Sequence, residues 1–142
     1  TSVDLFKTMN ELGKLKKYLH LPVQSGSDRV LKLMNRGYSR KFYLDLADNY
    51  RKIVRGGVLT TDVIVGFPTE NEEDFRETQD LIKAVRFNGA YIFKYSPRPA
   101  TEAFKMADTV SRQEKERRHR LILDMQKEIS SKVKSRKYEK HK

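Results

Sequence analysis

The sequence predicts an α/β fold: a partial TIM-type (β/α) barrel of about three parallel strands, with helices on the outer side and a long C-terminal helix. Three short segments rich in β-branched or aromatic residues alternate with amphipathic stretches at helical spacing. Those stretches are long enough to act as crossover helices, which make successive strands parallel. The chain has 142 residues, fewer than the roughly 200 of a complete eight-unit barrel, so it is too short to form a complete one.

Each predicted strand ends in a loop that contains serine, glycine or proline. The strands are expected at residues 18–24 (YLHLPVQ), 58–65 (VLTTDVIV) and 90–95 (AYIFKY). Working sites in parallel α/β folds lie beyond the carboxyl ends of the strands. The candidate site loops are therefore residues 24–27, 66–70 and 95–101.

Residues that cap helices precede the amphipathic stretches. The expected N-caps are Ser27, Ser39, Thr69 and Ser111. Their side-chain oxygens can accept hydrogen bonds from the N–H groups left free in a first helical turn. Glu72 follows Thr69 by three residues and Glu114 follows Ser111 by three, so both pairs match a capping box.

Charge divides the chain into two segments. The net charge is +11, and residues 111–142 hold 12 Lys/Arg against 5 Asp/Glu, whereas residues 1–110 hold 18 against 14. We expect residues 1–110 to form the barrel portion and residues 111–142 a long basic connecting helix. The positive balance favours a polyanionic partner such as nucleic acid, although a solvated lysine-rich surface would give the same numbers.

Composition excludes several classes of protein. The chain has no cysteine, so it holds no disulfide, thiolate zinc site or cysteine-ligated cluster of its own. No apolar run approaches the roughly 20 residues of a membrane span, which predicts no membrane partner and fits a cytoplasmic location. The histidines have no metal-ligand spacing, and no residue is assigned a catalytic role from the sequence.

Strand alternation selects the side chains that would face a cavity. The predicted cavity faces consist of His20, Pro22 and Gln24; Thr60, Asp62, Ile64 and Gly66; and Ile92, Lys94 and Ser96. Burial of Asp62 and Lys94 would cost roughly several kcal/mol each unless they were paired or solvated, so we expect both to line one ligand cavity. The competing interpretations are a structural Asp62–Lys94 ion pair and a register that turns these residues outward.

Three blocks, HLPVQSGSDRVLKLMNRGYSR, TTDVIVGFPTENEEDF and FKYSPRPAT, closely resemble the methylthiotransferase family of radical S-adenosylmethionine (SAM) enzymes. The resemblance covers about residues 3–131 and is greatest to the branch that makes 2-methylthio-N6-isopentenyladenosine in tRNA. It implies an enzyme that adds a methylthio group to C2 of a hypermodified adenosine near the anticodon, using SAM and 4Fe–4S clusters. The partners it implies are tRNA and SAM.

The same resemblance places the clusters on cysteines that this chain lacks: a CxxxCxxC motif near the start of the barrel and an amino-terminal domain. A TRAM domain is expected after the long helix. We therefore expect a fragment covering the later half of the barrel, inactive by itself, whose exposed surfaces allow self-association.

The resemblance also implies cofactor-binding residues. Gln24 and Ser25 would approach the ribose and amino-acid part of SAM, and the other expected contacts are Asp62, Ile64 and Gly66 at the adenine, with Lys94 and Ser96 closing that side. Thr69 and Ala100 stand where most relatives have glycine. Two other functions remain open, namely a non-catalytic basic RNA-binding module and a structural half-barrel without a ligand; a CxxxCxxC motif encoded upstream of Thr1 would favour the enzyme.

Overall fold

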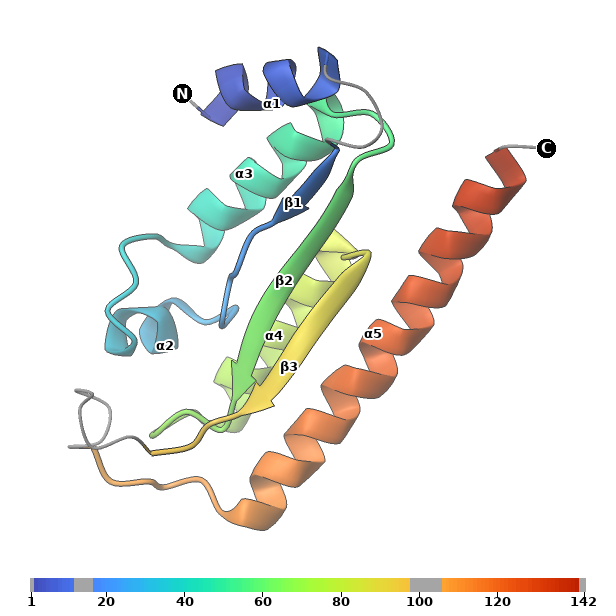
Figure 1. The fold of residues 1–142 in the computed structure, drawn as a ribbon. Helices are drawn as coiled ribbons and strands as arrows, with labels where there is room; N and C mark the ends of the chain where they lie inside the picture. Colours follow the sequence, from blue (N-terminus) through green and yellow to red (C-terminus); the bar gives the residue numbers. More distant parts are fainter. Residues whose placement is uncertain (1, 12–16, 98–105, 141–142) are drawn as a thin grey trace.

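The computed structural model describes residues 2–11, 17–97 and 106–140, with side chains as far as residue 133. Helices and strands alternate over most of this part of the chain (Figure 1). In chain order the elements are α1 (Ser2–Glu11), β1 (Tyr18–His20), α2 (Asp28–Leu33), α3 (Arg40–Ile53), β2 (Val58–Val65), α4 (Glu72–Val85), β3 (Gly89–Lys94) and α5 (Arg112–Lys140). None of these helices is both long and apolar enough to span a membrane.

The three strands form one parallel sheet in the order β1-β2-β3, with β2 in the centre. His20 lies opposite Thr60, and Asp62 lies opposite Tyr91. The carboxyl ends of all three strands therefore meet at one edge of the sheet. The predicted α/β half-barrel with three parallel strands is confirmed, although β1 is shorter than expected.

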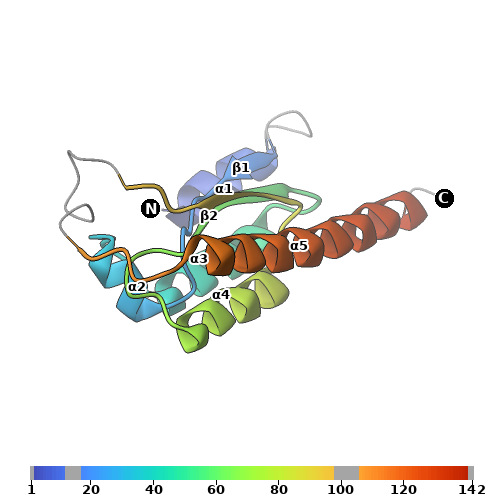
Figure 2. The same ribbon diagram turned by 90° about the horizontal axis from the view of Figure 1, so that it is seen from below.

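The two faces of the sheet differ in how they are covered. Helices α3 and α4 lie on one side of the sheet, and α5 runs alongside β3 (Figures 1 and 2). Leu59, Val63 and Val65 of β2 are fully buried and belong to the same hydrophobic core as the side chains of these helices. On the other face, Tyr91 and Phe93 remain 58% and 52% exposed. This second face, called the open face below, consists of the alternate residues of each strand.

The helix caps match the sequence prediction except at α4. Ser27, Ser39 and Ser111 each accept a hydrogen bond from a first-turn N–H group. The predicted Thr69–Glu72 capping box is wrong. Instead, Asn71 accepts from the Asp74 N–H at 2.8 Å, and the Asp74 carboxylate accepts from the Asn71 N–H at 2.9 Å.

Backbone geometry explains this two-residue shift. An N-cap residue has extended backbone angles, which Asn71 has and Thr69 lacks. Thr69 has φ 70°, in the left-handed region that glycine adopts most easily. A glycine at this position would therefore adopt the same backbone conformation more easily than threonine does. Ala100, the second such position, lies outside the described residues.

Candidate cofactor-binding site

The open face carries a hydrogen-bonded row of polar side chains from neighbouring strands. His20, the last residue of β1, places Nδ1 2.7 Å from Thr60 Oγ1 and Nε2 3.2 Å from Asp62 Oδ1. The Tyr91 ring of β3 meets the His20 ring edge-on, with centroids 6.0 Å apart. These four residues converge because the parallel register aligns His20 with Thr60 and Asp62 with Tyr91.

Apolar side chains continue this row towards the carboxyl ends of the strands. Ile64 of β2 lies opposite Phe93 of β3 and is partly exposed. The Asp62 side chain retains 30% of its exposure, so a ligand on this face can reach it. A partly solvated carboxylate beside an exposed aromatic side chain suits a molecule with both polar groups and a flat apolar ring, such as a nucleoside.

The predicted position of Lys94 on this face is wrong. Lys94 lies opposite Val65, which is fully buried on the helix-covered face, whereas Asp62 lies opposite Tyr91. The alternation of side chains within one strand shows which residues of that strand share a face. The register between β2 and β3 decides which face of β3 lies beside Asp62. In the described residues the ion-pair partner of Asp62 is His20, so the Asp62–Lys94 pair is not formed.

Lys94 and Ser96 instead line a cavity of about 360 Å³ next to the start of α5. Lys115, from the first turns of α5, enters this region and donates to Asp108 Oδ2 at 2.7 Å and to Tyr95 O at 3.3 Å. The cavity is thus formed by the end of β3 and α5, away from the Asp62 row.

A bulge at the end of β1 redirects Gln24 and Ser25. Four residue steps separate His20 from Gln24, but only three separate their partners Thr60 and Val63 on β2. Gln24 takes the extra step with a left-handed backbone, φ 69°. The expected common face of His20 and Gln24 is therefore wrong, because the added residue reverses the alternation.

Beyond the bulge, Ser25 turns into the protein. Its side chain is fully buried, and its hydroxyl accepts from the Ser27 N–H at 3.1 Å and lies 3.4 Å from Thr78 Oγ1 on α4. A direct contact between this hydroxyl and a ligand on the open face does not fit its burial. Ser25 therefore stabilises the loop after β1 through its contacts with Ser27 and Thr78.

Gly66 lies where the turn after β2 touches α5. It has φ 77°, and a Cβ placed on it would lie 2.4 Å from Lys115 Cγ. Its N–H donates to Glu70 Oε1 at 2.8 Å, and Arg118 Nη1 donates to the same oxygen at 2.9 Å. Burial raises the pKa of Glu70, opposed by the Gly66 N–H and by Arg118.

Sequence patterns do not indicate that Glu70 holds the turn at the end of β2. The only local signal was a glutamate in the predicted site loop 66–70, and its partner Arg118 is 48 residues away in the sequence. The pair fixes the β2–α4 turn relative to α5, and with it the position of Gly66 at the edge of the site.

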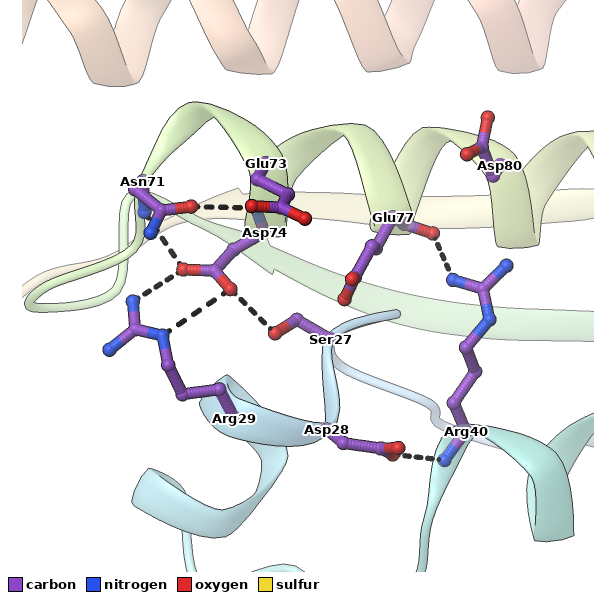
Figure 3. A pocket seen from close by; sticks show the side chains of 9 residues that line it. All are labelled: Ser27, Asp28, Arg29, Arg40, Asn71, Glu73, Asp74, Glu77 and Asp80. Carbon is purple, nitrogen blue, oxygen red and sulfur yellow. Dashed lines mark hydrogen bonds and ion pairs between the residues drawn. The ribbon is translucent and has the colours of Figure 1, made fainter.

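A second polar cluster lies on the helix side of the sheet, around a cavity of about 390 Å³ (Figure 3). Arg29 pairs with the Asp74 carboxylate, which also accepts from the Ser27 hydroxyl at 2.8 Å. Arg40 Nη1 donates to the backbone oxygens of Gly26 and Glu77 at 3.0 Å and 2.6 Å. These contacts attach the loop after β1 to α4, so the main hydrogen bonds of this cluster serve the fold.

The residues present limit which metal and cofactor groups the chain can hold. Among the described residues no cluster of His, Asp and Glu has the arrangement of a metal site, and the sequence has no cysteine. The residues present therefore do not fit an iron–sulfur cluster, which needs thiolate ligands. The open face does offer a carboxylate and apolar side chains that fit a nucleoside-containing cofactor.

The fold defines a class: a parallel (β/α) half-barrel with polar and aromatic side chains on its open face. The profile of the radical SAM superfamily matches residues 1–82, and the chain belongs to this superfamily. The structure is similar to that of coproporphyrinogen III oxidase from Escherichia coli, a radical SAM enzyme, with a TM-score of 0.73 and 23% identity over 89% of this chain and 30% of that one.

Similar sequences come from longer proteins. The chain is 46% identical over 132 residues to tRNA-2-methylthio-N(6)-dimethylallyladenosine synthase of Endomicrobium trichonymphae, covering 93% of this chain and 32% of the relative. It is 43% identical over 136 residues to the protein of the same name from Aquifex aeolicus, covering 96% and 31%. The chain thus spans about a third of the length of these curated relatives.

Proposed function

We propose that this chain is part of a radical SAM tRNA methylthiotransferase that adds a methylthio group to C2 of an N6-dimethylallyladenosine near the anticodon. The observation that carries the proposal is the open face, where a carboxylate on the central strand, Asp62, lies among nucleoside-compatible side chains. The names of the relatives with 43–46% identity support the substrate class.

SAM would lie against the carboxyl half of the open face. Asp62 would accept hydrogen bonds from the cofactor's hydroxyl or amino groups, and Ile64 would contact its adenine ring. Gly66 would contribute through its backbone at the end of β2, because Lys115 fills the space that a side chain there would occupy. Gln24 would contribute from the strand end, where its amide oxygen accepts from Arg36, and Ser25 would act indirectly by holding this loop.

Lys94 and Ser96, the two remaining predicted contacts, lie apart from Asp62. Lys94 and Ser96 would act from the cavity beside α5 rather than from the Asp62 row, by adding positive charge and a hydroxyl near the end of β3. SAM bound in the complete enzyme would supply radical chemistry, with the electron coming from a 4Fe–4S cluster whose ligands lie outside this chain. The chain itself has no cluster ligand, so it should form no 5′-deoxyadenosine when incubated alone with SAM and a strong reductant.

The tRNA partner and a cytoplasmic location belong to the same proposal. A basic RNA-binding helix acting alone is less well supported, because carboxylates neutralise several cations of α5. These pairs are Arg112–Glu116, Arg117–Glu72, Arg118–Glu70, Arg120–Asp124 and Lys132–Glu128. We also propose that the isolated chain self-associates through its open face.

The test of the function is turnover of the complete enzyme carrying Asp62→Asn on its tRNA. This change keeps the size of the side chain and removes the charge, so we expect methylthiolation at least tenfold slower, about 1.4 kcal/mol at the transition state. Asp45→Asn, at an exposed position of α3, is the matched control and should behave as wild type. Iron content checks that the clusters are retained. Wild-type turnover of Asp62→Asn would remove this residue from the site.

A further inference from the structure

His20 is bound through both ring nitrogens. Nδ1 lies 2.7 Å from Thr60 Oγ1, and Nε2 lies 3.2 Å from Asp62 Oδ1. An ionised carboxylate only accepts hydrogen bonds, so Nε2 carries the proton that points to Asp62. A Thr hydroxyl donates and accepts, so Thr60 can donate to Nδ1 of the neutral ring. For a neutral ring, this pair of contacts allows one tautomer and one orientation.

Packing restrains the same ring. The Tyr91 ring meets it at an interplanar angle of 67°, an edge-to-face contact across two strands that are not adjacent. The His20 side chain is 37% exposed, so the surrounding core does not fix it by burial alone. Thr60, Asp62 and Tyr91 together hold this half-exposed ring.

Within the described part of the chain, one oxygen of the Asp62 carboxylate has a partner. Among the described residues, Oδ1 contacts His20, whereas no hydrogen bond or ion pair involves Oδ2. The bond to His20 stops the carboxylate from rotating freely, and this leaves Oδ2 on the open face as an acceptor with a defined direction. A ligand that donates to this oxygen would not need to order the carboxylate first.

We propose that His20 is a positioning residue, which orients the Asp62 carboxylate so that its second oxygen accepts a hydrogen bond from a hydroxyl or amino group of the bound SAM. This inference rests on the proposed function. His20 is not a catalytic acid or base in this arrangement, because neither ring nitrogen is available to a reacting atom.

Two substitutions of His20 separate the roles of the two nitrogens. The amide nitrogen of glutamine lies near the position of Nε2, so His20→Gln retains a donor to Asp62 and loses the contact to Thr60. The shorter amide of asparagine lies near Nδ1, so His20→Asn retains the contact to Thr60 and loses the donor to Asp62. Both variants lose the ring and its contact with Tyr91, which makes each a control for the other.

The measurement is the Kd for SAM and the separate kcat and KM values of the complete enzyme. We expect His20→Asn to weaken SAM binding by about threefold to tenfold, the range of one ordinary hydrogen bond, because the Asp62 carboxylate can still accept but is no longer oriented. His20→Gln should stay within about twofold of wild type. In an Asp62→Asn background the two variants should bind SAM equally, because the group they orient has lost its charge.

The results distinguish the positioning role of His20 from the proposed ligand site at Asp62. Equal impairment by the two substitutions, or wild-type SAM binding by His20→Asn, would overturn the positioning role while Asp62→Asn remains defective. A wild-type Asp62→Asn would instead overturn the proposed ligand site itself. If neither variant folds, a measurement on the unsubstituted enzyme still tests the orientation of His20. Nitrogen-15 NMR of labelled histidine should show a proton on Nε2 of His20, and a ring without a proton on Nε2 would contradict the inference.

Discussion

Arg118 of α5 and Glu70 of the β2–α4 turn form a buried ion pair, with Nη1 2.9 Å from Oε1 and side-chain exposures of 6% and 1%. Arg118 also donates to the Glu70 backbone oxygen at 3.0 Å and to Glu114 at 2.9 Å. The pair therefore joins the long helix to the loop that carries Gly66. It links residues 1–110 to the basic segment of residues 111–142.

Removal of Arg118 should destabilise the protein strongly. We expect Arg118→Met to lower the free energy of unfolding by about 3 kcal/mol, because it leaves a buried carboxylate without its partner. Glu70→Gln should cost less, since its amide oxygen can still accept from Arg118 and from the Gly66 N–H. Urea unfolding measures both variants. Arg120→Met is the control, because the 3.7 Å pair of Arg120 with Asp124 is solvent-exposed; equal losses at both arginines would contradict the prediction.

Asp74 should make stability depend on pH in the acid range. Burial disfavours its charged form, but Arg29, the Asn71 N–H and the Ser27 hydroxyl together hold its pKa below the ordinary 3.8. A lowered folded-state pKa gives stability that is present above pH 3.8 and is lost as the pH falls through the folded-state pKa. Asp74→Asn should cost about 2 kcal/mol at pH 7, as expected for loss of hydrogen bonds to a charged group.

That cost should shrink as the pH is lowered from 5 to 2, because the wild-type protein loses the same contribution. Denaturant unfolding of both proteins at several pH values provides the comparison. Asp80→Asn, an exposed carboxylate on α4, should show a small difference that does not follow this pattern. A cost for Asp74→Asn that stays constant down to pH 2 would show that the carboxylate's charge is not the source of the stability.

Gly66 and Gly56 offer a comparison between backbone strain and steric contact. Both have positive φ, 77° and 71°, but a Cβ at Gly56 would meet no atom within 4 Å, whereas at Gly66 it would meet Lys115 Cγ at 2.4 Å. Lys115 cannot easily move, because its amino group is held by Asp108. We expect Gly56→Ala to cost about 1 kcal/mol and Gly66→Ala about 2–4 kcal/mol, measured by thermal or urea unfolding. Similar costs would mean that the contact with α5 is loose.

The open face should make the isolated chain associate. Exposed aromatic side chains on a sheet face favour contact with a second apolar surface, and Phe93 is 52% exposed there. Sedimentation of the 142-residue chain should show an average mass that rises with concentration, and Phe93→Ser should reduce this rise. Phe42→Ser is the matched control, because Phe42 is 58% exposed on α3. A monomer at all concentrations would disprove self-association.

Much of the fold follows from local features of the sequence. The β-branched run of residues 58–65 predicts the central strand, and serine caps predict the starts of α2, α3 and α5. The predicted N-cap of α4, Thr69, lies two residues before the observed one, Asn71, because two overlapping capping patterns compete there. Only the backbone angles distinguish them, with Asn71 extended and Thr69 left-handed.

By itself, the sequence determined the alternation of helices and strands, the loops at the strand ends and the lack of cysteine ligands, because each depends on nearby residues or on composition. The tertiary structure decided which side chains meet. It placed Tyr91 rather than Lys94 beside Asp62, turned Ser25 inward, and paired His20 with Asp62 and Glu70 with Arg118. The physical reason is that strand register and helix docking depend on hydrogen bonds and packing between segments about 30 to 50 residues apart, which alternation within one strand does not encode.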